Sequence, residues 1–350
     1  MLVAALALAI VGLAMVHSAS SELPVDYLPR QMAWVGLGLL LLLVVFSIDY
    51  HVLMGFAIPL YSLALALLVL VLVAGHEAGG SRSWIGIGGW RLQPSEFAKL
   101  ATAVLLARYL AAFKQRYLGT LQIAGMVALV ATPMLLVAVE PDLGGAAMFV
   151  PLAAGTLLVG GVRLRTFLVL AAALLLVGAL AWTFALRDYQ RQRVITFLQP
   201  GSDPLGAGYQ VRQSKIAVGS GELLGKGYRQ GTQSQLRFLP ARHTDFVFAV
   251  LAEEWGFVGV AGALGLYVVY LLNGARIAMR SRDRDGILLV VGLLSIFAFH
   301  VLYNTAMVVG LVPNTGIPLP FLSYGGSFTL VNFIATGIIL GVDFRRFANR

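Results

Sequence analysis

The sequence of 350 residues contains no cysteine, which excludes disulfide bonds, thiol nucleophiles and cysteine metal ligands. It is also poor in charge: 12% of the residues are Asp, Glu, Lys or Arg, while 59% are hydrophobic. A water-soluble core could not bury so much apolar surface. The composition therefore predicts an integral membrane protein and argues against a redox function.

Short segments of alternating polar and apolar residues, which membrane β-barrels require, are also missing. The apolar residues instead form long runs of Leu, Val and Ala, and a helix needs about 20 such residues to cross a bilayer. We place ten spans near 1–18, 30–48, 53–75, 95–112, 120–138, 143–161, 166–186, 246–272, 287–309 and 324–341. The predicted fold is one all-α domain, 1–350, made of ten transmembrane helices.

The basic residues predict the orientation of these spans. With a cytoplasmic N-terminus, the short inner loops hold eleven Lys and Arg, whereas the short outer loops hold only Arg30, Arg82 and Arg91. Positive charge concentrates on the cytoplasmic side of membrane proteins. Both termini are then cytoplasmic, and most of the net charge of +9 is an orientation signal and no sign of nucleic-acid binding.

One long extracytoplasmic loop, 187–245, connects the seventh and eighth predicted spans. Loops of this length are usually functional, and we expect this one to contribute to an active site. Within it, YQVRQSKIAV (209–218) is compatible with a short amphipathic helix at the membrane interface. Three shorter outer loops, which contain QPSEFAKL, EPDLGG and GLVPNTGIPLPFLSYGGS, are rich in Gly, Pro and charge and would line the same cavity.

The stretch FLPARHTDF ends the long loop and places Asp245 at the start of the eighth span. Its carboxylate could cap the helix, or it could accept a proton from a substrate hydroxyl. Arg237, Arg242 and His243 lie within eight residues of Asp245 and give this outer segment a surplus of positive charge. That surplus favours a functional role over capping alone.

Other carboxylates offer candidates for the same site. Glu96 and Lys99 lie one turn apart at the start of the fourth span, where they either support a site or cancel each other's charge. Asp142 follows Pro141 in a turn, where an aspartate is either functional or an ordinary turn former. We expect Glu96, Lys99, Asp142 and Asp245 to meet at the outer end of one cavity.

Glu253 and Glu254 follow Asp245 along the same predicted helix, roughly 12 Å further on. At about 100° per residue, neither lies beside Asp245 on the helix surface. Carboxylates inside a membrane are commonly functional, but a structural role that ties helices together fits equally well. We expect Glu253 to lie deeper and to contact neighbouring helices.

The glycine-rich segment GSGELLGKGYRQGT (219–232) suggests phosphate binding but departs from the Walker pattern, since Ser220 and Gly227 occupy required positions and no strand precedes it. Two alternatives remain. The loop could present Lys226 and backbone amides to a phosphate, or it could be a flexible linker.

These features allow two classes of protein. A transporter would place polar residues in broken helices near the middle of the bilayer, whereas an enzyme would gather them at one interface, as this sequence does. Ligand patterns made of His or Cys are missing. A divalent cation, Mg²⁺ or Mn²⁺, held by carboxylates such as Asp142 or Asp245 beside a diphosphate, is compatible with the sequence.

RSWIGIGGWRLQPSEFAKL, EPDLGGA, GSGELLGKGYRQGTQSQLRFLPARHTDFVFAVLAEEWGFVG and GLVPNTGIPLPFLSYGGS resemble the signatures of the SEDS family (shape, elongation, division and sporulation). The resemblance extends over the whole chain. The strings GTQSQL and FLPARHTDF resemble the rod-shape branch more than the cell-division branch.

This resemblance implies a peptidoglycan glycosyltransferase of the cytoplasmic (inner) membrane. Such an enzyme polymerises lipid II, an undecaprenyl-diphosphate-linked disaccharide pentapeptide, into β-1,4 glycan for cell elongation, together with a class B penicillin-binding protein. Asp245 matches the family's essential aspartate. Because an α-linked donor gives a β-linked product, the acceptor hydroxyl needs a base opposite the leaving group, and Asp245 is the candidate. The family has also been interpreted as lipid II flippases, which keeps a transporter as the alternative.

Overall fold

The computed structural model describes residues 1–21, 26–78, 81–87, 90–184, 186–199, 206–236 and 238–346. The elements in chain order are α1 (Leu2–Ser20), α2 (Leu28–Ser47), α3 (Tyr50–Gly55), α4 (Ala57–Ala74), β1 (His76–Ala78), β2 (Ser81–Ile87), β3 (Trp90–Leu92), α5 (Pro94–Ala111), α6 (Thr120–Val139), α7 (Leu143–Ala147), α8 (Phe149–Gly160), α9 (Leu164–Phe184), α10 (Asp188–Leu198), α11 (Ala207–Ser220), α12 (Thr232–Gln235), α13 (Val247–Arg280), α14 (Arg284–Val308) and α15 (Gly326–Arg345).

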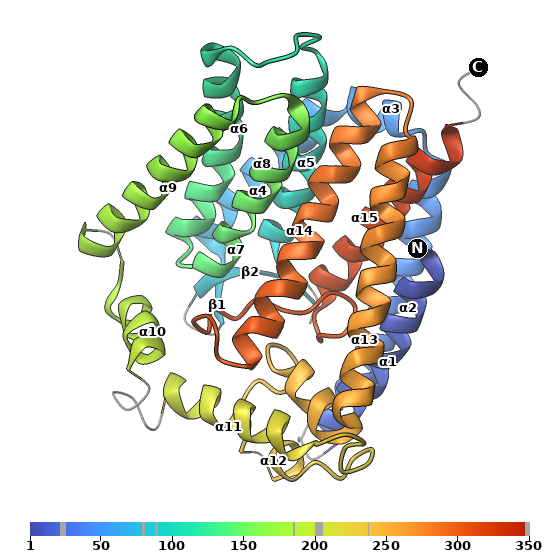
Figure 1. Ribbon diagram of the computed structural model, residues 1–350, viewed down its shortest axis with the longest axis vertical. Helices are drawn as coiled ribbons and strands as arrows, with labels where there is room; N and C mark the ends of the chain where they lie inside the picture. Colours follow the sequence, from blue (N-terminus) through green and yellow to red (C-terminus); the bar gives the residue numbers. More distant parts are fainter. Residues whose placement is uncertain are drawn as a thin grey trace.

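The long helices form one bundle (Figure 1). Within the described ranges, nine segments are long and apolar enough to cross a membrane: α1, α2, α4, α6, α7 with α8, α9, α13, α14 and α15. The protein is therefore a polytopic helical membrane protein, as predicted. The count of ten is not confirmed, because α5 carries three charged residues, Glu96, Lys99 and Arg108, and is not among these nine.

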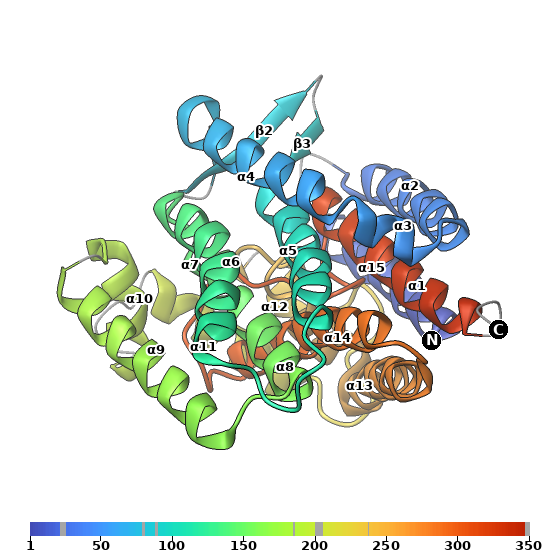
Figure 2. The ribbon, with the colours of Figure 1, turned by 90° about the horizontal axis from the view of Figure 1, so that it is seen from above.

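Helices α5 and α9 occupy opposite environments. Most residues of α5 are buried, and α5 packs against α4, α6 and α14, so its charged residues lie among protein atoms. In contrast, α9 has no buried residue and stands at the edge of the bundle (Figure 2). The polar helix is thus covered by apolar ones, which is what a hydrocarbon solvent requires.

A small antiparallel sheet accompanies the helices. Its order is β1-β2-β3, and the register pairs His76 with Trp84 and Ile85 with Leu92. These strands are three to seven residues long, which is too short for a clear alternation in the sequence. They lie in the loop between α4 and α5 and leave the helical fold class unchanged.

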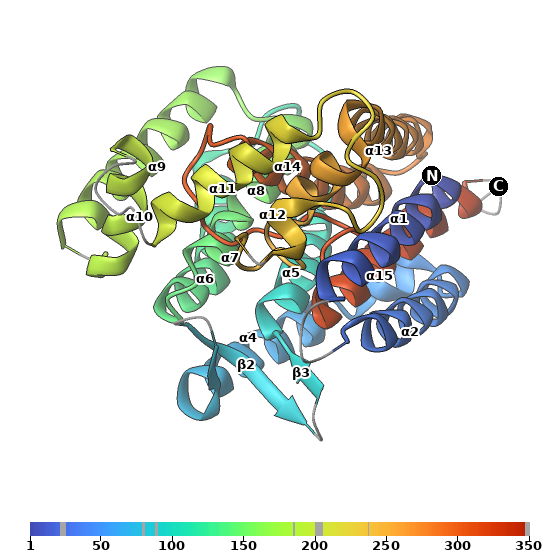
Figure 3. The same cartoon turned by 90° about the horizontal axis from the view of Figure 1, so that it is seen from below.

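Helices α10, α11 and α12 lie across one end of the bundle (Figures 1 and 3). The helix predicted at 209–218 is present as α11, Ala207–Ser220. Its Ser214 hydroxyl donates to the Val308 carbonyl at 2.8 Å, and Ala217 is buried beside it. These contacts hold the long loop against the ends of α13 and α14.

Helix α13 is broken near its start. A continuous helix of 34 residues would be about 51 Å long, well beyond the 30 Å of a bilayer core. Gly256 instead has φ 62° and ψ −161°. The freed backbone groups pair with the long loop, since Lys226 N donates to Glu253 O (3.0 Å) and Phe257 N donates to Glu222 O (2.9 Å). The first part of α13 is therefore separated from the membrane span.

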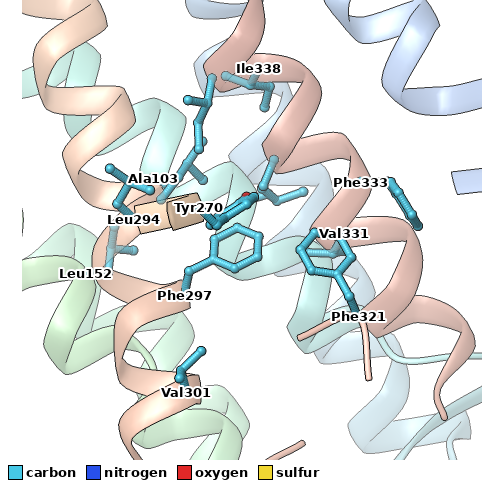
Figure 4. Packing of buried hydrophobic residues seen from close by; sticks show 14 of the residues in the cluster. Ala103, Leu152, Tyr270, Leu294, Phe297, Val301, Phe321, Val331, Phe333 and Ile338 are labelled. Carbon is cyan, nitrogen blue, oxygen red and sulfur yellow. The ribbon is translucent and has the colours of Figure 1, made fainter. Parts of the chain in front are cut away.

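An aromatic core lies beneath the loop that joins α14 to α15, residues 309–325 (Figure 4). Phe321 of this loop stacks on Phe297 of α14 with ring centroids 5.9 Å apart, and it meets Phe333 of α15 edge to face at 5.2 Å. Tyr270 of α13 packs beside them and hydrogen-bonds Thr336 at 2.9 Å. The loop is thus anchored in the core and can hold site residues in place.

Candidate functional site

Side chains of α14 fix the course of the α14–α15 loop (residues 309–325). The His300 Nδ1 group donates to the Pro318 carbonyl (3.0 Å), and the Asn304 amide donates to the Ile317 carbonyl (2.7 Å). Tyr303 donates its hydroxyl to the Pro313 carbonyl (3.0 Å). Because buried loop carbonyls need donors, these side chains select one conformation for the loop.

The same loop clamps the turn that carries Asp245. The Asn304 amide also donates to the Asp245 carbonyl (2.9 Å), and the Ser323 hydroxyl donates to the Thr244 carbonyl (2.6 Å). A Cβ atom built on Gly316, whose φ is 73°, would lie 3.5 Å from Asp245 Oδ2. The carboxylate therefore faces the loop backbone at Gly316, where a glycine leaves space beside it.

Asp245 does not cap the following helix. The N-cap of α13 is Phe246, and no side chain caps its amides. Burial raises the pKa of the Asp245 carboxyl to about 6, against the opposing effects of Thr244 and of the positive charge of Arg193. A half-buried carboxylate that ionises near pH 6, within a site of otherwise positive charge, has the properties of a general base.

His243 and Arg242 flank this turn. The His243 ring stacks on Tyr27 with centroids 4.7 Å apart, and Tyr324 N donates to its carbonyl at 2.8 Å. Burial, together with the positive charge of Arg242, lowers the pKa of His243 to about 4, so the ring is neutral at pH 7. Arg242 is itself buried and is the nearest source of positive charge in sequence.

Glu96 and Lys99 form a buried ion pair on α5, with the Lys99 ammonium 2.7 Å from the Glu96 carboxylate. They line a cavity together with His300, Phe328 and Asn332. Asp142 and Asp245 do not line it. The expectation that all four charged residues share one cavity is therefore not met by this cavity, although His300 and Asn304 of α14 connect its wall to the Asp245 turn.

Asp142 caps α7 by accepting from the Gly145 amide (2.8 Å), and it also accepts from the Gln93 amide group (3.1 Å) just before α5. A Cβ atom on Gly144 would lie 2.7 Å from the Thr315 carbonyl oxygen. Gly144 and Asp245 thus approach the same stretch of the α14–α15 loop. Asp142 and Asp245 lie on one side of the bundle, and Asp142 has a structural partner at each oxygen.

Glu140, one residue before Pro141, is fully buried, and its carboxyl oxygens have no hydrogen-bond partner among the residues that the structure describes. Burial raises its pKa to about 8, and the negative charge of Asp142 adds to this effect. Glu140 is therefore neutral at pH 7.

Lys226 pairs with Glu253 across 2.8 Å, so it is not a free cation of a flexible loop. Glu253 is fully buried and also accepts from the backbone amides of Gln233 (2.8 Å) and Ser234 (3.1 Å). Glu253 thus holds the long loop, and both of these amides belong to α12, so the neighbouring helix that it contacts is the short one within this loop. Arg237, another predicted supporting residue, lies outside the described residues.

The structure adds three residues that the sequence did not single out. The Asn304 amide donates a hydrogen bond to the Asp245 carbonyl, and the positive charge of Arg193 lowers the pKa of Asp245. Lys215 lines a cavity together with Arg193. Arg193 and Lys215 belong to a loop rich in basic residues, so charge alone did not distinguish them. Asn304 lies in an apolar helix, and this unusual polar position was a signal that could have found it.

Carboxylate and imidazole groups do not gather into a metal site in the described part of the chain: no group of three or more is placed to hold an ion. Asp142 and Asp245 belong to different elements and have separate surroundings. The protein side chains described here therefore do not form a metal cage by themselves.

Comparison with known proteins identifies the family. The profile of a family described as "Cell cycle protein", which takes in FtsW, RodA and SpoVE, matches residues 1–347. Peptidoglycan glycosyltransferase MrdB of Escherichia coli (strain K12) is 40% identical, over 99% of this chain and 93% of that protein. Peptidoglycan glycosyltransferase RodA of Treponema pallidum is 33% identical, over 99% and 97%.

Solved structures agree with this assignment. A structure described as "Structural coordination of polymerization and crosslinking by a peptidoglycan synthase complex" aligns with a TM-score of 0.85 at 34% identity, covering 99% of this chain and 98% of that one. The crystal structure of Thermus thermophilus rod-shape-determining protein RodA aligns with a TM-score of 0.74 at 31% identity, covering 99% and 96%. The chain belongs to the FtsW, RodA and SpoVE family of cell cycle proteins.

Proposed function

We propose that this protein is a peptidoglycan glycosyltransferase that polymerises lipid II into β-1,4 glycan strands for cell elongation. The observation that carries the proposal is Asp245, a carboxylate that caps no helix, is held by Asn304 and lies against Gly316 at the loop-covered end of the bundle. MrdB and RodA, which match nearly the whole chain, are named for this activity.

The reaction inverts the anomeric carbon of the donor sugar. Asp245 takes the proton from the acceptor's 4-hydroxyl, and the hydroxyl oxygen forms a bond to the anomeric carbon. The bond from that carbon to the diphosphate oxygen breaks, and its electron pair leaves on the diphosphate. With a pKa of about 6, raised by burial, Asp245 is ionised at neutral pH yet basic enough to accept a proton as the transition state forms.

The diphosphate leaving group gains negative charge as the bond breaks, and positive groups stabilise it. The positive charge of Arg193 lowers the pKa of Asp245, and the buried Arg242 lies three residues before Asp245 in the sequence. Both are candidates to stabilise the leaving group. A divalent cation, Mg²⁺ or Mn²⁺, is also compatible with the sequence. Because the described side chains gather no ligand set of their own, such an ion would depend on the substrate's phosphates, and none of the steps above requires it.

The protein works in the cytoplasmic membrane together with a transpeptidase. The protein lies in the cytoplasmic membrane with both termini cytoplasmic, so that α10, α11 and the Asp245 turn are extracytoplasmic, where lipid II is consumed. The similar synthase complex couples polymerization to crosslinking, which supports a class B penicillin-binding protein as the partner here.

A direct test incubates the purified protein, alone and with its transpeptidase partner, with labelled lipid II and measures glycan polymer. We expect polymer from the wild type and none from Asp245→Asn, which keeps the shape of the side chain but removes the base. Polymer from Asp245→Asn at the wild-type rate would overturn the assignment of Asp245.

A further inference from the structure

A second cavity lies between α10, α11 and the start of the α14–α15 loop. It has eight lining residues, among them Arg193, Thr196, Lys215, Gly310 and Asn314, and we call it the α10–α11 cavity. Two of its eight lining residues are cationic, and none is acidic. The wall therefore attracts anions.

Neither cation is neutralised by an ion pair within the part of the chain that the structure describes. Arg193 lies over the Tyr189 ring, with its guanidinium carbon 5.8 Å from the ring centroid, and Lys215 has no carboxylate of a described residue within ion-pair distance. By contrast, Lys99 and Lys226 each pair with a glutamate. Arg193 and Lys215 thus keep their charge available for a ligand.

The hydroxyl of Thr196 supplies an independent sign of a ligand. Thr196 is 3% exposed, and its Oγ1 atom has no hydrogen-bond partner among the described residues. Leaving a buried hydroxyl unpaired costs free energy, and this hydroxyl belongs to a residue that lines the cavity. A phosphate oxygen is an acceptor that the hydroxyl could donate to.

Glycine at position 310 makes room for the lysine. Gly310 has φ 72°, and a Cβ atom built there would lie 2.2 Å from Lys215 Cε and 2.6 Å from its Nζ atom. The ammonium therefore lies directly against the turn of the α14–α15 loop. Any larger residue at 310 would push it away from the cavity wall.

The α10–α11 cavity is close to the proposed reaction centre. Gly310 and Asn314 line the cavity, and Gly316, two residues after Asn314, faces the Asp245 carboxylate. The guanidinium of Arg193 also acts on Asp245. An anion in this cavity would therefore contact the same loop that faces the base. The exposed apolar helix α9 and helix α10 lie next to each other at this side of the molecule (Figure 3).

We propose that the α10–α11 cavity binds the diphosphate of a polyprenyl-linked substrate, with Arg193, Lys215 and the Thr196 hydroxyl contacting its oxygens. This inference deepens the proposed glycosyltransferase function and rests on it for the identity of the substrate. The polyprenyl chain continues from the diphosphate into the lipid, and the sugar on its other side reaches toward Asp245.

Binding is measured with the full-length protein in phosphatidylcholine nanodiscs and with undecaprenyl diphosphate as the probe. Lys215→Gln and Thr196→Val are compared with Arg212→Gln, which removes a charge from the same helix at an exposed position outside the cavity wall. We expect Lys215→Gln to weaken binding about tenfold or more, since a charge-assisted hydrogen bond is lost. Thr196→Val weakens it about threefold, and Arg212→Gln leaves it within about twofold.

The kinetic counterpart is a KM for lipid II that rises in Lys215→Gln while kcat changes little. Unchanged binding of undecaprenyl diphosphate in both cavity variants overturns the proposed site, whatever the polymerase activity. Equal competition by phosphatidylglycerol would also overturn it, because the cavity would then be a general site for anionic lipids. If the variants weaken binding but the wild type forms no polymer, the site stands and the glycosyltransferase function falls.

Discussion

Among single residues, Asp245 is the one on which the proposed chemistry depends, and its surroundings hold it in place. Its backbone is clamped by Asn304, and its side chain lies against Gly316, without acting as the cap of α13. The sequence identified Asp245 because His243 and Arg242 stand beside it. It could not identify Asn304, nor distinguish Arg193 from the other basic residues of the long loop, since their contacts join segments that are far apart along the chain.

The raised pKa of Asp245 predicts the pH dependence of polymerisation. A base must be ionised, and burial raises the pKa of this carboxyl to about 6. Activity should therefore be constant above pH 7 and fall about tenfold per unit below pH 6, as measured by kcat/KM for lipid II. Arg193→Gln should shift this fall in kcat/KM to higher pH, since the variant loses a positive charge that lowers the pKa of Asp245. A kcat/KM that falls only below pH 4 would contradict the assignment of Asp245 as the base.

The sequence made Lys226 a candidate for phosphate binding, with a flexible linker as the alternative, but its ion pair with Glu253 predicts a structural effect. Lys226→Gln leaves the buried Glu253 carboxylate with its backbone donors and no counter-charge, and should lower the free energy of unfolding by about 2 kcal/mol. Thermal unfolding in detergent measures this, with the exposed Arg229→Gln as a control that changes stability by less than about 0.5 kcal/mol. The double variant with Glu253→Gln should recover part of the loss.

The opposite pattern, with unchanged stability and a raised KM for lipid II in Lys226→Gln, would restore the phosphate-binding hypothesis for that residue.

At the scale of elements, the break in α13 is what brings the long loop onto the bundle. Hydropathy predicted one span at 246–272, and the helix found is Val247–Arg280. The sequence could not predict the break, because Gly256 is one of several glycines in this helix and only the loop at 222–226 distinguishes it. The helix at 209–218 was predictable from its own apolar spacing, but α10, α12 and the three short strands were not.

Gly256→Ala tests this break. The conformation of Gly256 is one that residues with a side chain avoid, and the added Cβ atom would lie 2.3 Å from Gly225 N and 2.6 Å from Leu223 O. We expect a loss of about 3 kcal/mol or more in unfolding free energy. Gly262→Ala in the same helix meets nothing within 4 Å and should be neutral or stabilising. Equal melting temperatures for the two variants would contradict the role of the break.

At the scale of the whole molecule, the apolar runs of the sequence predicted a polytopic helical bundle, and the structure and the family comparisons confirm it. Composition alone could not show that α5, with its Glu96–Lys99 pair, is surrounded by other helices. The orientation of the bundle stays a prediction from the basic loops. Asp245, the α10–α11 cavity and the Asp142 turn all approach one loop, which fits chemistry at one membrane surface.

The most direct test of the central claim separates polymerisation from lipid transport. The protein and its partner are reconstituted in vesicles, lipid II is added to the leaflet that faces the Asp245 end, and both glycan polymer and headgroup accessibility are measured. We predict polymer in the wild type, none in Asp245→Ala, and lipid II that stays in its leaflet in both. Rapid movement of lipid II between leaflets without polymer, and unaffected by Asp245→Ala, would contradict the account and favour a flippase.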